Sequence, residues 1–459
     1  MDKLDVVIVG GGITGASIAR DCALRGLKNI LLLEQRQIGQ ATTSVSTGLA
    51  NRGLRYIDYD LELTKISAQE VSILQSIAPH LLESRKFLIP FFRDSKFNIE
   101  LFESVLKAYE AIIGQYGAPK HERLGKEQTL IEEPLLAPDV RGSLRIEELL
   151  LRDSELARQS AEQACRLGAG LGIGWKVNGV ERKNNRLVVR VGRLFHPSDW
   201  FEVETQILCN ATGPWAEQFA GQLGCSVKLR PTKGVHIMVD KVGLSHGLIL
   251  DAPDHRYPLT AIRKGSEGWV YVGPTDEDFP ETEFDPATLM SSEKQQQATA
   301  EERQYLLTAI QRVIPGIAPD QVRGFTIGVR PTLFQKGVKP ERLSRNFQIF
   351  DHQEDGLPGF ISVAGGKLTI ARLMAEKATD LICKKLNHSA ECVTAVTPIN
   401  ATASAVRLPK MQYQNNSAFS SSKPPLASLF KRAYASGRIG WYFVKHIFQN
   451  PRSVLSFFH

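Results

Sequence analysis

A strand, a glycine-rich turn and a helix in the first forty residues constrain the fold of this chain more than any other feature. Leu4–Val9 is apolar apart from Asp5, Gly10–Gly15 follows it directly, and Ala16–Gly26 has the spacing of a helix. A second predicted strand, Asn29–Leu33, ends at Glu34. Strands covered by helices on both faces are apolar throughout, so this order predicts a βαβ unit of a parallel sheet.

The spacing of the glycines suits the binding of phosphates. Gly10 allows a tight turn, Gly12 lets the backbone approach a pyrophosphate, and Gly15 lets the helix pack closely on the strand. The helix N-terminus adds free N–H groups and the positive end of the helix dipole. Glu34 is placed to accept hydrogen bonds from an adenosine ribose. The unit predicts a dinucleotide site and does not by itself distinguish NAD from FAD. Its position favours FAD, because a unit at the start of the chain that is followed by a long remainder of interrupted segments is more typical of flavoproteins.

Charge is distributed unevenly along the 459 residues. The formal net charge is +7, yet no Asp or Glu follows Glu391, and eight Lys or Arg residues stand in that last stretch. The residues before it therefore sum to a net charge of −1. A body without excess positive charge does not suit a nucleic-acid-binding surface, so we expect no nucleic-acid partner and a tail that alone is basic.

The cysteines and the N-terminus indicate the compartment. The six cysteines form no CxxC pair, so we expect neither a metal site nor a disulfide framework. Met1–Asp5 leads into an apolar strand without a secretory leader, and no apolar run reaches the roughly 20 residues that span a bilayer. These features favour a cytoplasmic protein.

The remainder of the chain alternates between helical and strand-like patterns. Leu61 to about Gly114 is mainly helical in pattern, whereas Gly234–Val239 and Trp269–Val272 are typical of strands in an antiparallel sheet. Near the end, the apolar run Phe360–Val363 precedes Gly365-Gly366 and a helical pattern. This second strand–glycine–helix junction can return to the first, which predicts a nucleotide domain interrupted by substrate-domain segments.

Six motifs in a fixed order resemble those of the FAD-dependent glycerol-3-phosphate dehydrogenases. They are Gly10–Gly15 with Ala19–Gly26, Gly53–Tyr56, Asn210–Trp215, Lys233–His236, Gly328–Pro331 and Gly365–Thr369. The resemblance covers about residues 4–390 and is closest to the large subunit of the anaerobic form, without its cysteine-rich tail.

The resemblance implies an α/β fold like that of D-amino-acid oxidase. The FAD-binding domain would comprise residues 1–60, 150–230 and 325–390, and the antiparallel-sheet substrate domain residues 61–149 and 231–324. Residues 391–425 would form a linker of low order, and residues 426–459 a short helical, basic, amphipathic tail. The residues that would contact FAD are Gly10, Gly12, Gly15, Glu34, Thr42, Thr43, Ser44, Gly48, Val177, Thr212, Gly213, Gly365, Gly366, Lys367, Leu368 and Thr369.

The resemblance also implies the substrate and the reaction. Arg55, Tyr56, Arg330 and Arg345 would bind sn-glycerol 3-phosphate, because planar guanidinium groups grip phosphate oxygens in pairs. A hydride would pass from C2 to the flavin, giving dihydroxyacetone phosphate, with the electrons going on to a quinone. His236, Arg330 and Lys367 would be catalytic. His236 is the first choice of base because imidazole titrates near neutral pH.

Several positions depart from the family pattern. Asn51 stands where His is usual, Ile327 where Ser is usual, and Ile370-Ala371 where a Thr-Tyr pair is usual; Pro274 replaces the first Thr of a Thr-Thr-Asp element. Two alternatives therefore stay open. One is a flavin oxidase or dehydrogenase of an amino acid or 2-hydroxy acid, and the other is a flavin-binding scaffold without catalysis.

The tail suggests a membrane partner. Leu426, Leu429, Phe430 and Tyr434 fall at helical spacing beside Lys and Arg residues. Aromatic residues interleaved with cations suit the headgroup layer of an anionic membrane. The sequence thus predicts a peripheral protein on the inner face of the cell membrane, against the alternative of a helical cap on the body. A homodimer is compatible with the sequence.

Overall fold

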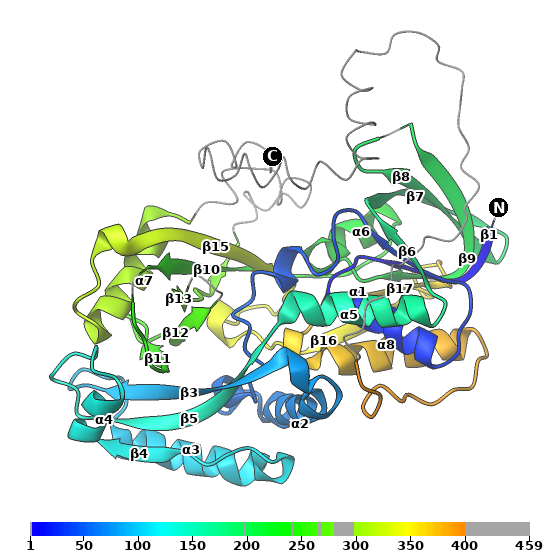
Figure 1. Ribbon diagram of the computed structural model, residues 1–459. Helices are drawn as coiled ribbons and strands as arrows, with labels where there is room; N and C mark the ends of the chain where they lie inside the picture. The colour runs from blue at the N-terminus through cyan, green and yellow to red at the C-terminus, as the bar shows by residue number, and fades with distance from the viewer. Residues whose placement is uncertain (1, 197, 241, 265–267, 280–297, 400–459) are drawn as a thin grey trace, which may run out of the picture.

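Two β-sheets, one parallel in its centre and one almost wholly antiparallel, lie side by side and form the body of the protein (Figure 1). The computed structural model describes residues 2–399 except 197, 241, 265–267 and 280–297. The expected amphipathic tail at 426–459 and most of the expected linker at 391–425 lie outside the described residues.

The first sheet has the strand order β16-β17-β9-β1-β2-β6, with β8 and β7 attached beside β9. Its central strands are parallel: β1 pairs with β2 and β9, β9 pairs with β17, and β2 pairs with β6. The strands are β1 (Asp2–Val9), β2 (Ile30–Glu34), β6 (Gly170–Ile173), β7 (Trp175–Lys183), β8 (Arg186–Arg193), β9 (Trp200–Asn210), β16 (Phe347–Asp351) and β17 (Phe360–Gly365).

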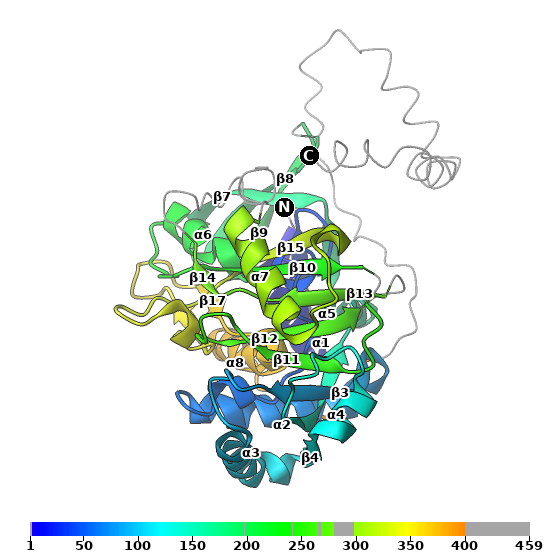
Figure 2. The same cartoon turned by 90° about the vertical axis from the view of Figure 1, so that its left-hand side faces the viewer.

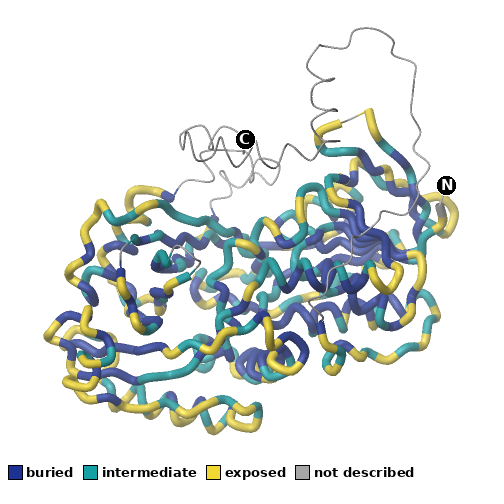
Figure 3. Tube along the Cα trace, in the orientation of Figure 1, coloured by how far each residue is buried: buried dark blue, intermediate teal, exposed yellow. Residues whose placement is uncertain are grey.

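Apolar packing covers this sheet on both faces, as the apolar runs predict. Helices α1 (Ile13–Leu24), α5 (Asp153–Arg166) and α8 (Ala371–Lys385) pack together on one face, where Val6 and Ile8 point. On the other face, Val7 packs with strands β7 and β8 and helix α6 (Ala216–Gln222). Figure 3 shows the resulting concentration of buried residues around the parallel strands. The predicted βαβ unit is present.

The second sheet has the order β14-β10-β13-β12-β11-β3-β5-β4, with β15 beside β10. Helix α7 (Ala300–Val313) covers one of its faces (Figure 2), while α2 (Leu61–Ile77), α3 (Ile99–Ile113) and α4 (Lys126–Glu132) lie near β3–β5. The strands are β3 (Leu82–Phe91), β4 (Glu122–Gly125), β5 (Gly142–Leu151), β10 (Thr232–Val239), β11 (Gly247–Asp251), β12 (Pro258–Lys264), β13 (Trp269–Gly273), β14 (Glu277–Asp278) and β15 (Val322–Arg330).

The region from residue 61 to about 114 is mainly helical, as expected, but strand β3 interrupts it. The strand separates α2 from α3 and pairs with β5 from Leu82 to Phe91. Pro90, which suggests a break between helices, lies inside this strand. The partner strand is about 60 residues further along the chain, so the pairing has no local signal.

The domain boundaries expected from the sequence fall inside two strands. The boundary at residue 149 lies within β5 and the boundary at 325 within β15. Both strands belong entirely to the second sheet, because β5 pairs with β3 and β15 pairs with β10.

Residues 391–399 are packed on the body, although they were expected to begin a linker of low order. The N–H of Ile399 donates to the carbonyl of Ile77 at 2.7 Å, and Arg20 and Gln163 donate to the carbonyls of Thr397 and Pro398. Ile399 is 4% exposed. Distant polar side chains thus hold a segment whose own composition gives no sign of order.

We predict that truncation after residue 390 lowers the free energy of unfolding by about 2–3 kcal/mol, because it removes buried Ile399 and the hydrogen bonds of this segment. A chain ending at residue 399 is the control and should keep these contacts. Urea denaturation of both proteins measures the difference. Equal midpoints would show that the segment contributes no stability.

Candidate active site

A single cavity of about 1170 Å³ runs between the two sheets and contains almost all of the predicted site residues. All the expected substrate and catalytic residues line it, namely Arg55, Tyr56, His236, Arg330, Arg345 and Lys367. Of the expected cofactor residues, only Gly15 and Ser44 do not line it. Gly15 packs behind the turn, and the exposed Ser44 hydroxyl donates to the carbonyl of Ala41.

Close backbone packing explains the glycines at the start of helix α1. Gly10 has φ +107°, and a Cβ there would lie 2.5 Å from the carbonyl oxygen of Ala211 at the end of β9. A Cβ on Gly15 would overlap the carbonyl oxygen of Gly10. Neither position can hold a side chain without moving backbone. Gly12, by contrast, leaves the N-terminus of α1 open to the cavity.

Glu34 is anchored at the end of β2. Its two carboxylate oxygens accept hydrogen bonds from the N–H groups of Gly11 and Arg36, each at 2.7 Å. Burial raises the pKa of this carboxyl, and these backbone donors oppose that shift. Glu34 therefore joins the second strand to the glycine turn and keeps its carboxylate on the cavity wall.

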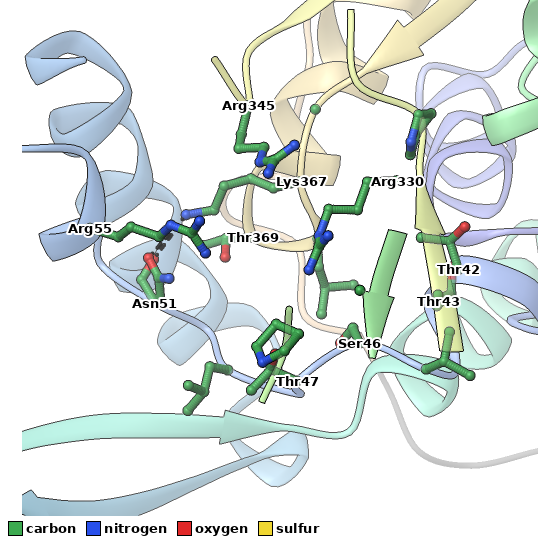
Figure 4. A pocket seen from close by; sticks show the side chains of 18 of the residues that line it. Thr42, Thr43, Ser46, Thr47, Asn51, Arg55, Arg330, Arg345, Lys367 and Thr369 are labelled. Atoms are coloured by element: carbon green, nitrogen blue, oxygen red, sulfur yellow. Dashed lines mark hydrogen bonds between the residues drawn. The ribbon is translucent and has the colours of Figure 1, made fainter. Parts of the chain in front are cut away.

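Three arginines from separate parts of the chain converge on Asp276. Arg55 lies in the short helix η2 (Leu54–Tyr56), Arg330 ends β15, and Arg345 precedes β16. Their guanidinium nitrogens lie 2.5 Å, 3.2 Å and 2.7 Å from the carboxylate oxygens of Asp276, which is fully buried. Figure 4 shows the three arginines and Lys367 around one space.

The arginine cluster retains positive charge. Burial raises the pKa of Asp276, but Arg345, Arg330 and Arg55 together hold it well below its usual range. One carboxylate therefore balances only one of three guanidinium charges. The excess of two positive charges faces the cavity and matches a doubly charged anion such as a phosphate monoester.

His236 stands on β10 with both ring nitrogens near hydroxyl groups. Nε2 lies 3.2 Å from Thr47 Oγ1 and Nδ1 lies 3.4 Å from Thr326 Oγ1. The side chain is buried. Burial first, then the charges of Lys264 and Arg330, lowers the pKa of His236 to about 3. The imidazole is therefore neutral at physiological pH, as a base must be before it accepts a proton.

Lys367 reaches across the cavity toward the segment that carries Asn51. Its Nζ donates to Asn51 Oδ1 at 3.1 Å (Figure 4) and to Ser67 Oγ at 3.0 Å. It also lies 4.7 Å from the centre of the Tyr56 ring. Burial lowers the pKa of Lys367. Asn51, one of the departures from the family pattern, thus fixes the position of a cavity lysine.

The other departures fall into two groups. Pro274 lines the cavity, whereas Ile327, Ile370 and Ala371 do not. Ile327 packs against the core of the second sheet, and Ile370 is fully buried in the core beside α1. The departures at Ile327, Ile370 and Ala371 therefore affect packing away from the cavity. They remove no polar group from the cavity wall.

Three polar residues near the cavity were missing from the predicted site. Asp276 had a sequence signal, because it belongs to the Pro274-Thr275-Asp276 element. Lys264 had none; burial lowers its pKa to about 8, and its Nζ donates to the carbonyl of Ser46. Glu148 on β5 also had none, and it lines the cavity. Their importance arises from burial, which a local pattern does not encode.

Comparison with known proteins identifies relatives of this chain. The family model described as FAD-dependent oxidoreductase matches residues 5–381. The aerobic glycerol-3-phosphate dehydrogenase of Staphylococcus haemolyticus is 31% identical over 87% of this chain and 71% of its own length. The corresponding protein of Staphylococcus aureus strain MRSA252 is 30% identical over 84% of this chain and 68% of its own length.

Comparison with solved structures also finds FAD-dependent oxidoreductases. The glycerol-3-phosphate dehydrogenase of Bacillus halodurans, complexed with FAD, aligns with a TM-score of 0.66 and 27% identity over 86% of this chain and 67% of its own. The glycine oxidase of Geobacillus kaustophilus aligns with a TM-score of 0.60 and 19% identity over 88% of this chain and all of its own, a likeness of fold alone. The expected fold class and the FAD cofactor are confirmed.

The described residues fit FAD. The glycine turn and Glu34 border one end of the cavity, and Gly365–Thr369 border it after β17. Thr369 Oγ1 is buried and has no hydrogen-bond partner among the described residues. A buried hydroxyl normally has a partner, and a flavin ring edge in this cavity would supply one. Thr42 and Val177 also line the cavity.

We predict that Asp276→Asn lowers the free energy of unfolding by about 2–4 kcal/mol, because three guanidinium groups lose their common carboxylate. Inorganic phosphate should restore part of this loss by binding the arginines. Asp278→Asn is the control: Asp278 pairs with Arg230 at the surface, and its loss should cost less than about 1 kcal/mol. Thermal unfolding with and without phosphate measures both effects.

Proposed function

The chain belongs to the FAD-dependent oxidoreductases and, within them, to the glycerol-3-phosphate dehydrogenase family, and we propose that it oxidises sn-glycerol 3-phosphate to dihydroxyacetone phosphate. One observation carries the proposal: three arginines share a single buried aspartate inside the FAD cavity. They provide two uncompensated positive charges, which complement a phosphate dianion. This cluster lies in the same cavity as the Gly365–Thr369 segment.

Each residue of the cluster has a role in this reaction. Arg55, Arg330 and Arg345 hold the phosphate and so orient the three-carbon chain. FAD, when bound, supplies the acceptor for the hydride that leaves C2. The neutral imidazole of His236 accepts a hydrogen bond from the C2 hydroxyl, and the Lys367 ammonium stabilises negative charge that develops on the oxygen.

A second candidate is the oxidation of an amino acid or a 2-hydroxy acid. The fold is shared with glycine oxidase, and arginines also bind carboxylates in pairs. A carboxylate carries only one negative charge, however, whereas the arginine cluster has an excess of two positive charges. A scaffold without catalysis is less well supported, because Ile327, Ile370 and Ala371 do not line the cavity.

We predict that anaerobic glycerol 3-phosphate bleaches the flavin. We also predict that Arg330→Ala raises KM about 10–100-fold while FAD stays bound, because a charge-assisted contact contributes about 1.5–3 kcal/mol. Arg323→Ala is the matched control, because Arg323 lies on the same strand but pairs with Asp240 at the surface. Steady-state kinetics and flavin absorbance measure both. Bleaching by glycine or a 2-hydroxy acid, and not by glycerol 3-phosphate, would favour the second candidate.

We also propose a quinone as the electron acceptor. Apolar side chains that include Leu54, Phe91 and Phe102 also line the cavity. Phe97 and Leu101 line it as well, and they are large, apolar and exposed. Such a lining suits an apolar ring better than a polar acceptor. No helix in the described part of the chain is long and apolar enough to cross a membrane.

An acceptor of this kind resides in the membrane, so we propose that the protein works at its inner face and that the basic tail docks there. We predict that the FAD-loaded protein co-sediments with anionic vesicles and that removal of residues 426–459 abolishes this while the flavin spectrum is unchanged, because each Lys or Arg near anionic lipid contributes about 1 kcal/mol. Neutral vesicles are the control. A truncated protein that still binds anionic vesicles would contradict the tail's role.

A further inference from the structure

Oxidation of an alcohol releases a proton from the hydroxyl group, so a group in the cavity must accept that proton. This inference rests on the function proposed above. His236 can accept a hydrogen bond from the hydroxyl, but its lowered pKa of about 3 prevents it from retaining a proton at neutral pH. Asp276 is occupied by three arginines. A different group must be the final acceptor.

Glu148 has the geometry of such an acceptor. It lies on β5, it is 7% exposed, and it lines the cavity. Its Oε2 atom is shielded from solvent and has no hydrogen-bond partner among the described residues. Its nearest cation, Nη1 of Arg52, lies 3.7 Å away. Buried carboxylate oxygens are normally hydrogen-bonded, so this atom has an unused capacity to accept a proton.

The surroundings of Glu148 leave that acceptor available. Arg52 directs the same Nη1 to the carbonyl oxygen of Glu147 at 3.3 Å. Arg85, directly opposite on β3, pairs with Glu83. From α3, the buried hydroxyl of Tyr109 also has no partner among the described residues. The remaining charge that acts on Glu148 from the cavity is Lys367.

A short stretch of backbone brings Glu148 and Lys367 to the same side of the cavity. The N–H of Ala50 donates to the carbonyl of Leu149, the residue after Glu148, at 2.9 Å. The next residue, Asn51, accepts a hydrogen bond from Lys367 Nζ. Lys367 therefore lies near the wall that contains Glu148, and its charge acts on that carboxyl.

We propose that Glu148 stores the proton that leaves the substrate hydroxyl and that it acts through Lys367. As the C2 hydrogen leaves with its electron pair for FAD, the O–H bond breaks and its electrons form the ketone. The Lys367 ammonium gives one proton to Oε2 of Glu148, and the neutral amine that results takes up the hydroxyl proton, so Lys367 ends as an ammonium again. The neutral carboxylic acid then returns the proton to solvent after the product leaves. Glu148 is thus a positioning and proton-storing residue that does not touch the substrate.

The acid–base properties of the two groups support this direction of transfer. Burial raises the pKa of Glu148 to about 7, against the opposing effect of Arg52 and Lys367. Burial lowers the pKa of Lys367. The two shifts bring donor and acceptor closer in proton affinity, which favours transfer. Below about pH 7, Glu148 is already protonated and cannot accept, so the reaction should accelerate as pH rises through this value.

Glu148→Gln tests the proposal, because it keeps the shape and removes the ionisation. Stopped-flow bleaching of the flavin by anaerobic glycerol 3-phosphate should show an inflection near pH 7 in the parent protein. The variant should lose the inflection and react about 100-fold more slowly, with the substrate concentration at half-maximal rate unchanged. Glu148→Asp should retain the inflection. Glu147→Gln, on the same strand but outside the cavity, should behave as the parent.

An infrared titration gives a readout that does not depend on turnover. The FAD-loaded parent should show a buried carboxylic-acid band that disappears as pH rises through about 7, and Glu148→Gln should lack it. A folded, FAD-loaded variant with an unchanged pH profile would overturn the role of Glu148 alone. A parent protein that glycerol 3-phosphate does not bleach would instead overturn the proposed function, and this role with it.

Discussion

The carboxylate of Asp276 is buried without solvent contact and forms ion pairs with Arg55, Arg330 and Arg345, which stand in three different segments of the chain. An isolated carboxylate in this position would be strongly disfavoured. The arginines remove that penalty, and the carboxylate in turn holds three like charges together that would otherwise repel one another. The shape and the charge of the substrate end of the cavity both depend on this arrangement.

The cofactor end of the same cavity depends on where parallel strands end. The glycine turn follows β1, Ala211 follows β9, and the Gly365–Thr369 segment begins at the end of β17. All three strands run in the same direction, so their carboxyl ends meet at one edge of the sheet, where α/β sheets bind ligands. Thr42 Oγ1 donates to the carbonyl of Val329 on β15 at 2.6 Å, which joins this edge to the second sheet beside Arg330.

Burial sets the proton affinities of the groups between these two ends. It lowers the pKa of His236 and of Lys367 and raises that of Glu148. A wet cleft would leave all three near their ordinary values, with the histidine partly charged and the carboxyl fully ionised. Burial therefore turns common side chains into a neutral hydrogen-bond acceptor, a lysine with a lowered pKa and a carboxyl that titrates near neutral pH.

Local patterns in the sequence determined the βαβ unit and its dinucleotide site, because glycine turns and apolar runs act within a few residues of themselves. The resemblance of six short motifs added FAD and the site residues named from it, nearly all of which line the cavity. Tertiary structure alone decided the rest. Strand β3 and the packed segment 391–399 have partners far away in the chain. Glu148 looks like an ordinary surface acid in the sequence, and the Pro274-Thr275-Asp276 element gives no sign of the three arginines around Asp276. Both acids acquire their properties only when distant elements remove water from them. Desolvation depends on everything that surrounds a group, and no short stretch of sequence contains that information.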